Sequence, residues 1–203
     1  MDKNAIEIGR LLRSGIAGYV AGARVSEKES PQFGALVRAP LGADLQTYGL
    51  IYDIHVDDDG LVRQLVTAEN VDAAVIEDNR VNRVVPMEMS IMAVGYRNGE
   101  SIVHLLPPRP PLSLDVIHQC SPAELVEFTS AGSFGYFRHI LRAPDAPVGE
   151  ILAAHIQAAS AAHEEAGNSE WRAEATQELI TLLRDDYATL MAVLSALGDA
   201  LPE

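Results

Sequence analysis

A chain of 203 residues, 48% of them apolar and 22% charged, can bury one sizeable core or two modest ones without metal or disulfide support. Its single cysteine, Cys120, excludes an intrachain disulfide framework and fits a reducing compartment. The N-terminus has no signal-peptide pattern, and no apolar run approaches the roughly 18 residues of a membrane helix. We therefore expect a cytoplasmic protein that does not enter a membrane.

The formal net charge of −14 is unevenly distributed, because residues 113–203 carry 14 acidic and only 4 basic side chains. Nucleic-acid binding relies on Lys and Arg side chains that release counterions from phosphates. The acidic balance therefore argues against direct nucleic-acid binding. A local basic groove is the alternative, and its candidate residues are Arg10, Arg13, Arg24 and Arg38.

Residues 1–112 predict a small β-barrel. A short helix is expected first, over residues 2–13. Gly15, Gly18 and Gly22 lie among apolar residues and predict a bent strand. Further strands are expected over 33–39, 48–56, 61–66, 88–96 and 101–106, with a helix over 67–80. Asn98-Gly99 suits a type I′ turn and predicts the hairpin that joins the last two strands.

Residues 113–203 predict a separate helical domain. The proline-rich run 107–111 must be extended and marks the boundary at residue 112. Ser121-Pro122-Ala123-Glu124 predicts a capped helix start. Other helices are expected over 134–141, over 148–165 and from residue 168 or 169 onward. The fold class is therefore α+β, a small barrel followed by a helical region that contains an antiparallel helical hairpin.

The last expected helix carries apolar residues at alternating spacings of three and four, which is the pattern of a coiled-coil-like packing surface. These residues are the candidate interaction site: Ile180, Leu183, Tyr187, Leu190, Leu194 and Leu197.

Sites for catalysis or cofactors are not indicated by the motifs. The only lysines, Lys3 and Lys28, do not follow a glycine, so no P-loop is present. The Asp57–Gly60 run fails as an EF-hand loop, because that alignment places His55 at position one and Val66 at position twelve. We predict no catalytic residue, no metal site and no cofactor, and cofactor-binding residues stay unknown.

A family resemblance adds to this interpretation. It is carried by Gly18-Tyr19-Val20, Phe33-Gly34, Tyr48–Ile54, Ala93–Tyr96 and Pro107–Pro111. With these motifs, residues 14–112 resemble the HAS barrel, named for HerA-type ATPases and F-type ATP synthases. The resemblance implies an N-terminal module that packs side by side into a ring crown, while a separate RecA-like domain performs the ATP chemistry. Here a helical region stands where that ATPase domain would follow.

Three functions are compatible with the sequence. The first is a non-catalytic assembly or accessory protein, whose barrel mediates oligomerisation or docking to a P-loop ATPase. The second is a small-molecule or nucleotide-binding module that uses the barrel mouth or the barrel–helix crevice. The third is a hydrolase built around Asp53, His55 and Asp57, which alternate along one strand and the turn that follows it.

Overall fold

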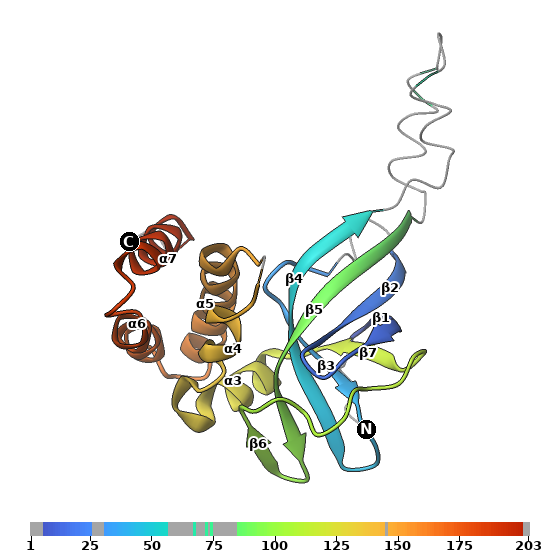
Figure 1. Ribbon diagram of the computed structural model, residues 1–203, viewed down its shortest axis with the longest axis horizontal. Helices are drawn as coiled ribbons and strands as arrows, with labels where there is room; N and C mark the ends of the chain where they lie inside the picture. The colour runs from blue at the N-terminus through green and yellow to red at the C-terminus, as the bar shows by residue number, and fades with distance from the viewer. Residues whose placement is uncertain are drawn as a thin grey trace.

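The computed structural model describes residues 6–25, 31–56, 67, 72, 74, 85–144 and 146–200. A β-barrel and a helical region lie side by side in it (Figure 1). The strands are β1 (Ile6–Ser14), β2 (Gly18–Val25), β3 (Leu36–Pro40), β4 (Leu45–Val56), β5 (Val85–Asn98), β6 (Ser101–Val103) and β7 (Val116–Gln119). The described α-helices are α3 (Pro122–Ser130), α4 (Phe137–Leu141), α5 (Val148–Glu165), α6 (Trp171–Leu182) and α7 (Tyr187–Ala200). The expected α+β class is confirmed.

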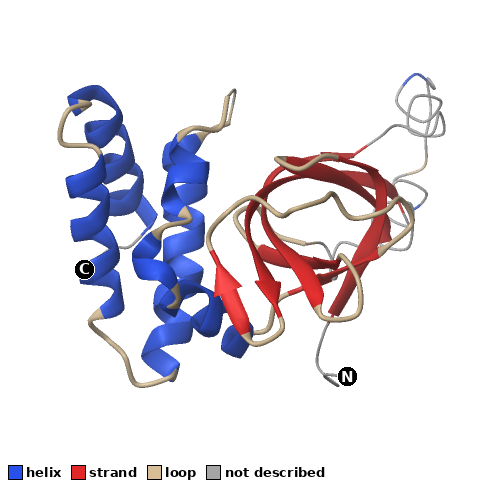
Figure 2. Ribbon diagram, turned by 60° about the horizontal axis from the view of Figure 1, so that its bottom comes forward, coloured by secondary structure: helices blue, strands red, loops and turns tan. Residues whose placement is uncertain are grey.

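Six antiparallel strands close the barrel. β2, β1, β7, β3, β4 and β5 pair in that order, and β5 pairs back to β2. Figure 2 looks into the closed ring, with the helices against one wall. Closure leaves these strands without a free edge, while β6 extends the wall as a hairpin on β5.

The expected helix over residues 2–13 is wrong, because Ile6–Ser14 form strand β1. The strand pairs irregularly at two places, between Glu7 and Gly9 and between Leu11 and Arg13. Each irregularity inserts a residue and shifts the inward-outward alternation. Ile8 and Leu11 are both buried although they stand three residues apart, which is a helical spacing.

The other strand predictions of the first half are largely confirmed. β2, β4 and β5 cover the expected segments, and Gly99 adopts the left-handed conformation of the expected hairpin turn, with a φ of 59°. β7 is an additional strand of the barrel, and it lies beyond the expected domain boundary at residue 112. The expected strand at 61–66 and most of the expected helix at 67–80 lie outside the described residues, as does the run 57–60 before them.

The barrel interior is filled by aliphatic side chains and one tyrosine. Its buried members are Ile8, Leu11, Tyr19, Ala21, Val37, Ala39, Ile51, Met87, Met89, Ile91 and Ile117. Gly49 lies against the Tyr19 hydroxyl, and a Cβ at this glycine would lie 2.6 Å from the tyrosine Oη. The interior is therefore a packed core.

The expected helix start at Ser121 is confirmed. The Ser121 hydroxyl accepts a hydrogen bond from the Glu124 amide, and the Glu124 carboxylate accepts one from the Ser121 amide. This reciprocal pair satisfies two amides that the first turn leaves without helical partners. Glu124 also pairs with Arg38 of β3 at 2.7 Å, so the cap attaches α3 to the barrel.

The last three helices run up, down and up. Gly149 near the start of α5 lies beside Ala192 and Ala196 of α7, while Gln157 donates to the carbonyl of Ala200. α7 therefore runs in the direction of α5, and α6 makes the return between them. The expected antiparallel hairpin is present as α5 and α6.

The expectation of one continuous last helix is wrong, because α6 ends at Leu182 and α7 begins at Tyr187. The Asp186 carboxylate accepts hydrogen bonds from the amide and the hydroxyl of Thr189, at 3.1 and 2.7 Å. Such a side chain favours a helix start over a helix interior. The heptad spacing therefore continues across a turn.

One core joins the barrel to the helices. Tyr48 and Leu50 of β4 and Val94 of β5 belong to the same buried cluster as Phe128 and Tyr136 of the helical region. The ring centroids of Tyr48 and Phe128 are 4.8 Å apart. The helices therefore pack directly on the outer face of the β4–β5 wall.

Candidate functional site

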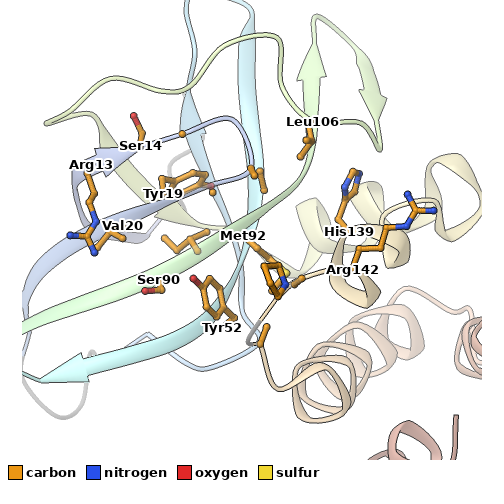
Figure 3. Close-up of a pocket in the computed structure, with 18 of the residues that line it drawn as sticks. Arg13, Ser14, Tyr19, Val20, Tyr52, Ser90, Met92, Leu106, His139 and Arg142 are labelled. Atoms are coloured by element: carbon orange, nitrogen blue, oxygen red, sulfur yellow. The ribbon is translucent and has the colours of Figure 1, made fainter. Parts of the chain in front are cut away.

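A cleft of about 800 Å³ lies where the barrel meets the helical region. Three parts of the chain contribute to its wall: residues 13–20 at the β1–β2 turn, residues 90–93 of β5, and residues 138–144 with Ala146 around and after the end of α4. Tyr52 and Leu106 complete its wall. Figure 3 shows Arg13 on the barrel side and Arg142 with His139 on the helix side, with Tyr19, Met92 and Tyr52 between them. Its volume lies within the range of small-molecule pockets.

Backbone geometry shapes the barrel side of this cleft. The Gly15 amide donates to the Gly18 carbonyl at 2.8 Å and closes the β1–β2 turn. A Cβ at Gly18 would lie 2.6 Å from the Ile91 carbonyl oxygen, so only glycine lets β2 approach β5 this closely. Tyr52 is the extra residue of a β-bulge, where β4 pairs through Ile51 and then through Asp53 with consecutive residues of β5. The bulge re-aims the Tyr52 side chain into the cleft.

The helix side of the cleft is positioned by one backbone carbonyl. Arg138 donates to the His104 carbonyl, and the Nε2–H of His139 donates to the same oxygen at 3.1 Å. Burial lowers the pKa of His139, and Arg138 and Arg142 add to this effect. A neutral imidazole with its proton on Nε2 fits this geometry.

The charge of the cleft is opposite to that of the whole chain. Arg13, Arg138 and Arg142 line it, and no carboxylate is among its described lining residues. The ion pairs of the described chain lie elsewhere: Arg10–Glu7, Arg38–Glu124, Arg97–Glu127 and Arg184–Asp185. The cleft thus collects guanidinium groups that form no ion pair within the described residues.

Sequence reasoning anticipated only part of this cluster. Of the arginines suggested as a basic groove, Arg13 lies in the cleft. Arg10 and Arg38 line another cavity, and both pair with glutamates. The side chain of Arg24 lies outside the described residues. The sequence does contain a signal for the other arginines of the cleft, because Arg138 and Arg142 stand four residues apart in the strongly acidic second half of the chain.

A second feature is an apolar strap, defined here as residues 105–114, which follows the barrel surface. Its leucines Leu105, Leu106, Leu112 and Leu114 are exposed, the last two to 72% and 71%. Leu114 donates its amide to the carbonyl of Leu11, and the Ser113 hydroxyl bonds the carbonyl of the exposed Leu12. The strap and β1 therefore carry exposed leucines on adjacent segments.

Leu114 holds an unfavourable backbone conformation, with a φ of 73°. A left-handed conformation costs a leucine on the order of 1–3 kcal/mol. The turn is fixed by bonds of Asp115, whose amide donates to the Leu112 carbonyl and whose carboxylate accepts from the Leu112 amide. The surrounding bonds thus hold a strained apolar residue in solvent.

The candidate interaction residues of the last helices do not form one exposed stripe. Leu183 and Leu197 are buried, Leu190 and Leu194 are partly buried against the shared core, and Ile180 and Tyr187 are 37% and 72% exposed. Much of the seam therefore packs within the chain itself. A role of its exposed members in binding a partner stays a prediction.

Two residues of the hydrolase hypothesis, Asp53 and His55, do not line the cleft. Asp53 and His55 have exposed side chains on β4, and Asp57 lies outside the described residues. Burial raises the pKa of the Cys120 thiol, with Glu124 acting in the same direction. That shift disfavours a reactive thiolate.

The described residues contain neither a candidate metal centre nor a membrane-spanning helix. No group of three or more His, Cys, Asp or Glu side chains there could hold a metal ion. No helix in that part of the chain is both long enough and apolar enough to span a bilayer. Comparison with known proteins gave no match to any family model or to any curated protein. The resemblance to the HAS barrel therefore stays a hypothesis.

Proposed function

We propose that this protein is a non-catalytic assembly module whose barrel docks another protein, either a second copy of itself or a P-loop ATPase. The observation that carries the proposal is the apolar strap with its exposed leucines. At one end of the strap, the exposed Leu112 and Leu114 lie on a segment that is hydrogen-bonded to β1 beside the exposed Leu12. An exposed apolar patch of this kind is typical of protein interaction sites. A strained Leu114 held in solvent supports the same interpretation, because backbone strain concentrates at functional positions.

Variants of Leu114 test this proposal, because they separate stability from association. Asn tolerates a left-handed conformation better than Leu, so Leu114→Asn is expected to keep or raise the melting temperature. The combined variant Leu112→Ser/Leu114→Asn is expected to lose self-association or co-purification with an ATPase. Light scattering coupled to gel filtration measures the first, and pull-down from the native cytosol the second.

The matched control is Leu182→Ser, which removes a leucine that is also exposed but lies on α6, away from the barrel. It is expected to associate like the parent. A strictly monomeric parent that also captures no P-loop ATPase would contradict the proposal.

A second candidate function is small-molecule binding in the cleft between barrel and helices. It is favoured by a specific observation, the cavity of about 800 Å³ lined by arginines that form no ion pair with any other described residue. A protein of this kind can bind both a partner and a ligand, since the strap and the cleft share only Leu106.

A further inference from the structure

We propose that the cleft binds a small phosphorylated ligand with a flat ring, such as a nucleoside phosphate. The phosphate would lie at Arg138 and Arg142, and the ring against Tyr52. This inference rests on the second candidate function and names its ligand class. It is independent of the docking function assigned to the strap.

Cationic side chains are concentrated at the cleft. Residues 113–203 contain four basic side chains, and two of them, Arg138 and Arg142, line the cleft. Arg13 of β1 lines it as well. Like charges gathered around one cavity repel each other, and an anion bound among them removes that cost. Guanidinium groups also match the geometry of phosphate oxygens better than ammonium groups do.

Arg138 is held in place before any ligand binds. Arg138 lies within α4 and Arg142 is the residue that ends this helix, and both line the cleft. Arg138 donates from one nitrogen to the His104 carbonyl, which restrains the guanidinium, and a guanidinium has further N–H donors that a ligand can use. Holding a cation in place before binding reduces the entropy that ligand binding costs.

An aromatic ring and a thioether line the body of the cleft. Tyr52 projects into it from the bulge of β4, and Met92 lies beside Tyr52 in the cavity wall (Figure 3). An aromatic face next to a thioether suits a flat, partly apolar ring. The ring and the charged end of one ligand would thus contact different walls of the same cavity.

The surrounding charge selects small anions over polymers. A net charge of −14 repels a long polyanion, whose many phosphates cannot all lie on three arginines. A ligand with one or two phosphates places all of its negative charge inside the cleft. The preference for a mononucleotide over nucleic acid follows from this difference.

The test is a thermal-shift and calorimetry series on the full chain in the presence of EDTA, with adenosine, AMP, ADP and inorganic phosphate as probes. AMP and ADP are expected to raise the melting temperature, because they stabilise the folded state by mass action. Adenosine is expected to give no shift, and phosphate a weaker one than AMP. Arg142→Gln is expected to raise the Kd for ADP about tenfold. Tyr52→Ala is expected to weaken the binding of AMP more than the binding of phosphate.

Arg172→Gln is the matched control, since it makes the same charge change at an exposed position of α6 outside the cleft. It is expected to bind like the parent. Absence of any shift with AMP, ADP and phosphate overturns the inference, as does equal binding by the Arg142→Gln variant. Adenosine binding that survives Arg142→Gln would leave the cleft a ligand site and overturn only the assigned ligand class. None of these outcomes bears on light scattering of the strap variants.

Discussion

At the scale of single residues, the closest contacts of the barrel depend on the absence of side chains. Gly18 lies against the backbone of β5, and Gly49 lies against Tyr19 and Ile91 inside the barrel. A methyl group at either position would lie closer to neighbouring atoms than van der Waals contact allows. These positions let the strands close around a packed interior.

Replacing Gly18 with alanine is expected to destabilise the fold by roughly 1–3 kcal/mol, as overpacking does in cores. The added Cβ would lie 2.6 Å from the Ile91 carbonyl oxygen, and backbone cannot move as a flexible side chain can. Urea unfolding measures the change. Gly198→Ala is the control, because nothing lies within 4 Å of a Cβ there and alanine favours the helix α7. Equal unfolding midpoints for the two variants would contradict the prediction.

At the scale of elements, the boundary between α6 and α7 is set by local hydrogen bonds. Leu183 continues the core side of α6, while Asp186 turns the chain and begins α7. Two bonds from Thr189 lower the pKa of the Asp186 carboxyl. The bonds therefore favour the ionised side chain at the start of α7.

Asp186→Ala is expected to lower the urea midpoint, because it removes both bonds to Thr189. Asp185→Ala is the neighbouring control. Asp185 pairs with Arg184 on the exposed surface, and such pairs contribute little to stability. If both variants unfold at the same midpoint, the carboxylate of Asp186 does not determine where α7 begins.

At the scale of the whole molecule, buried imidazoles lie within and beside the core that joins barrel and helices. His155 of α5 forms a 3.1 Å hydrogen bond with the Tyr136 hydroxyl, and burial lowers its pKa to about 4. His104 packs on Phe128 with ring centroids 4.8 Å apart, and burial lowers its pKa too. His163 stacks on Trp171 and has a lowered pKa for the same reason. These rings are neutral in the folded protein at pH 7.

The protein is therefore expected to lose stability in mild acid. The unfolded chain has histidine pKa values near 6.5, so it binds more protons than the folded chain below that pH. The free energy of unfolding should fall as the pH drops from about 6.5 toward 4, with His155 contributing up to roughly 3 kcal/mol. Urea unfolding at pH 7.5, 6 and 5 measures the slope. His155→Gln should reduce that slope, and an unchanged slope would exclude His155 as its source.

The sequence predicts correctly those elements that depend on interactions between residues close together in the chain. The Ser121 cap, the Asn98-Gly99 hairpin and the helix over 148–165 depend on neighbours within a few residues, and all three were predictable. β1 was mispredicted because its irregular pairing with β2 and β7 gives Ile8 and Leu11 a helical spacing. Strand bulges are set by partners distant in sequence, so local periodicity does not reveal them.

The sequence by itself determined the α+β class, a barrel of apolar strands, the helix cap at Ser121 and the acidic character of the second half. Only the tertiary structure decided that Arg13 and Arg142, more than a hundred residues apart, line one cleft with Tyr52. It also decided that most of the leucine seam is used within the chain. The physical reason is the same in both cases: propensity and capping act between near neighbours, whereas a cleft exists only where distant segments pack.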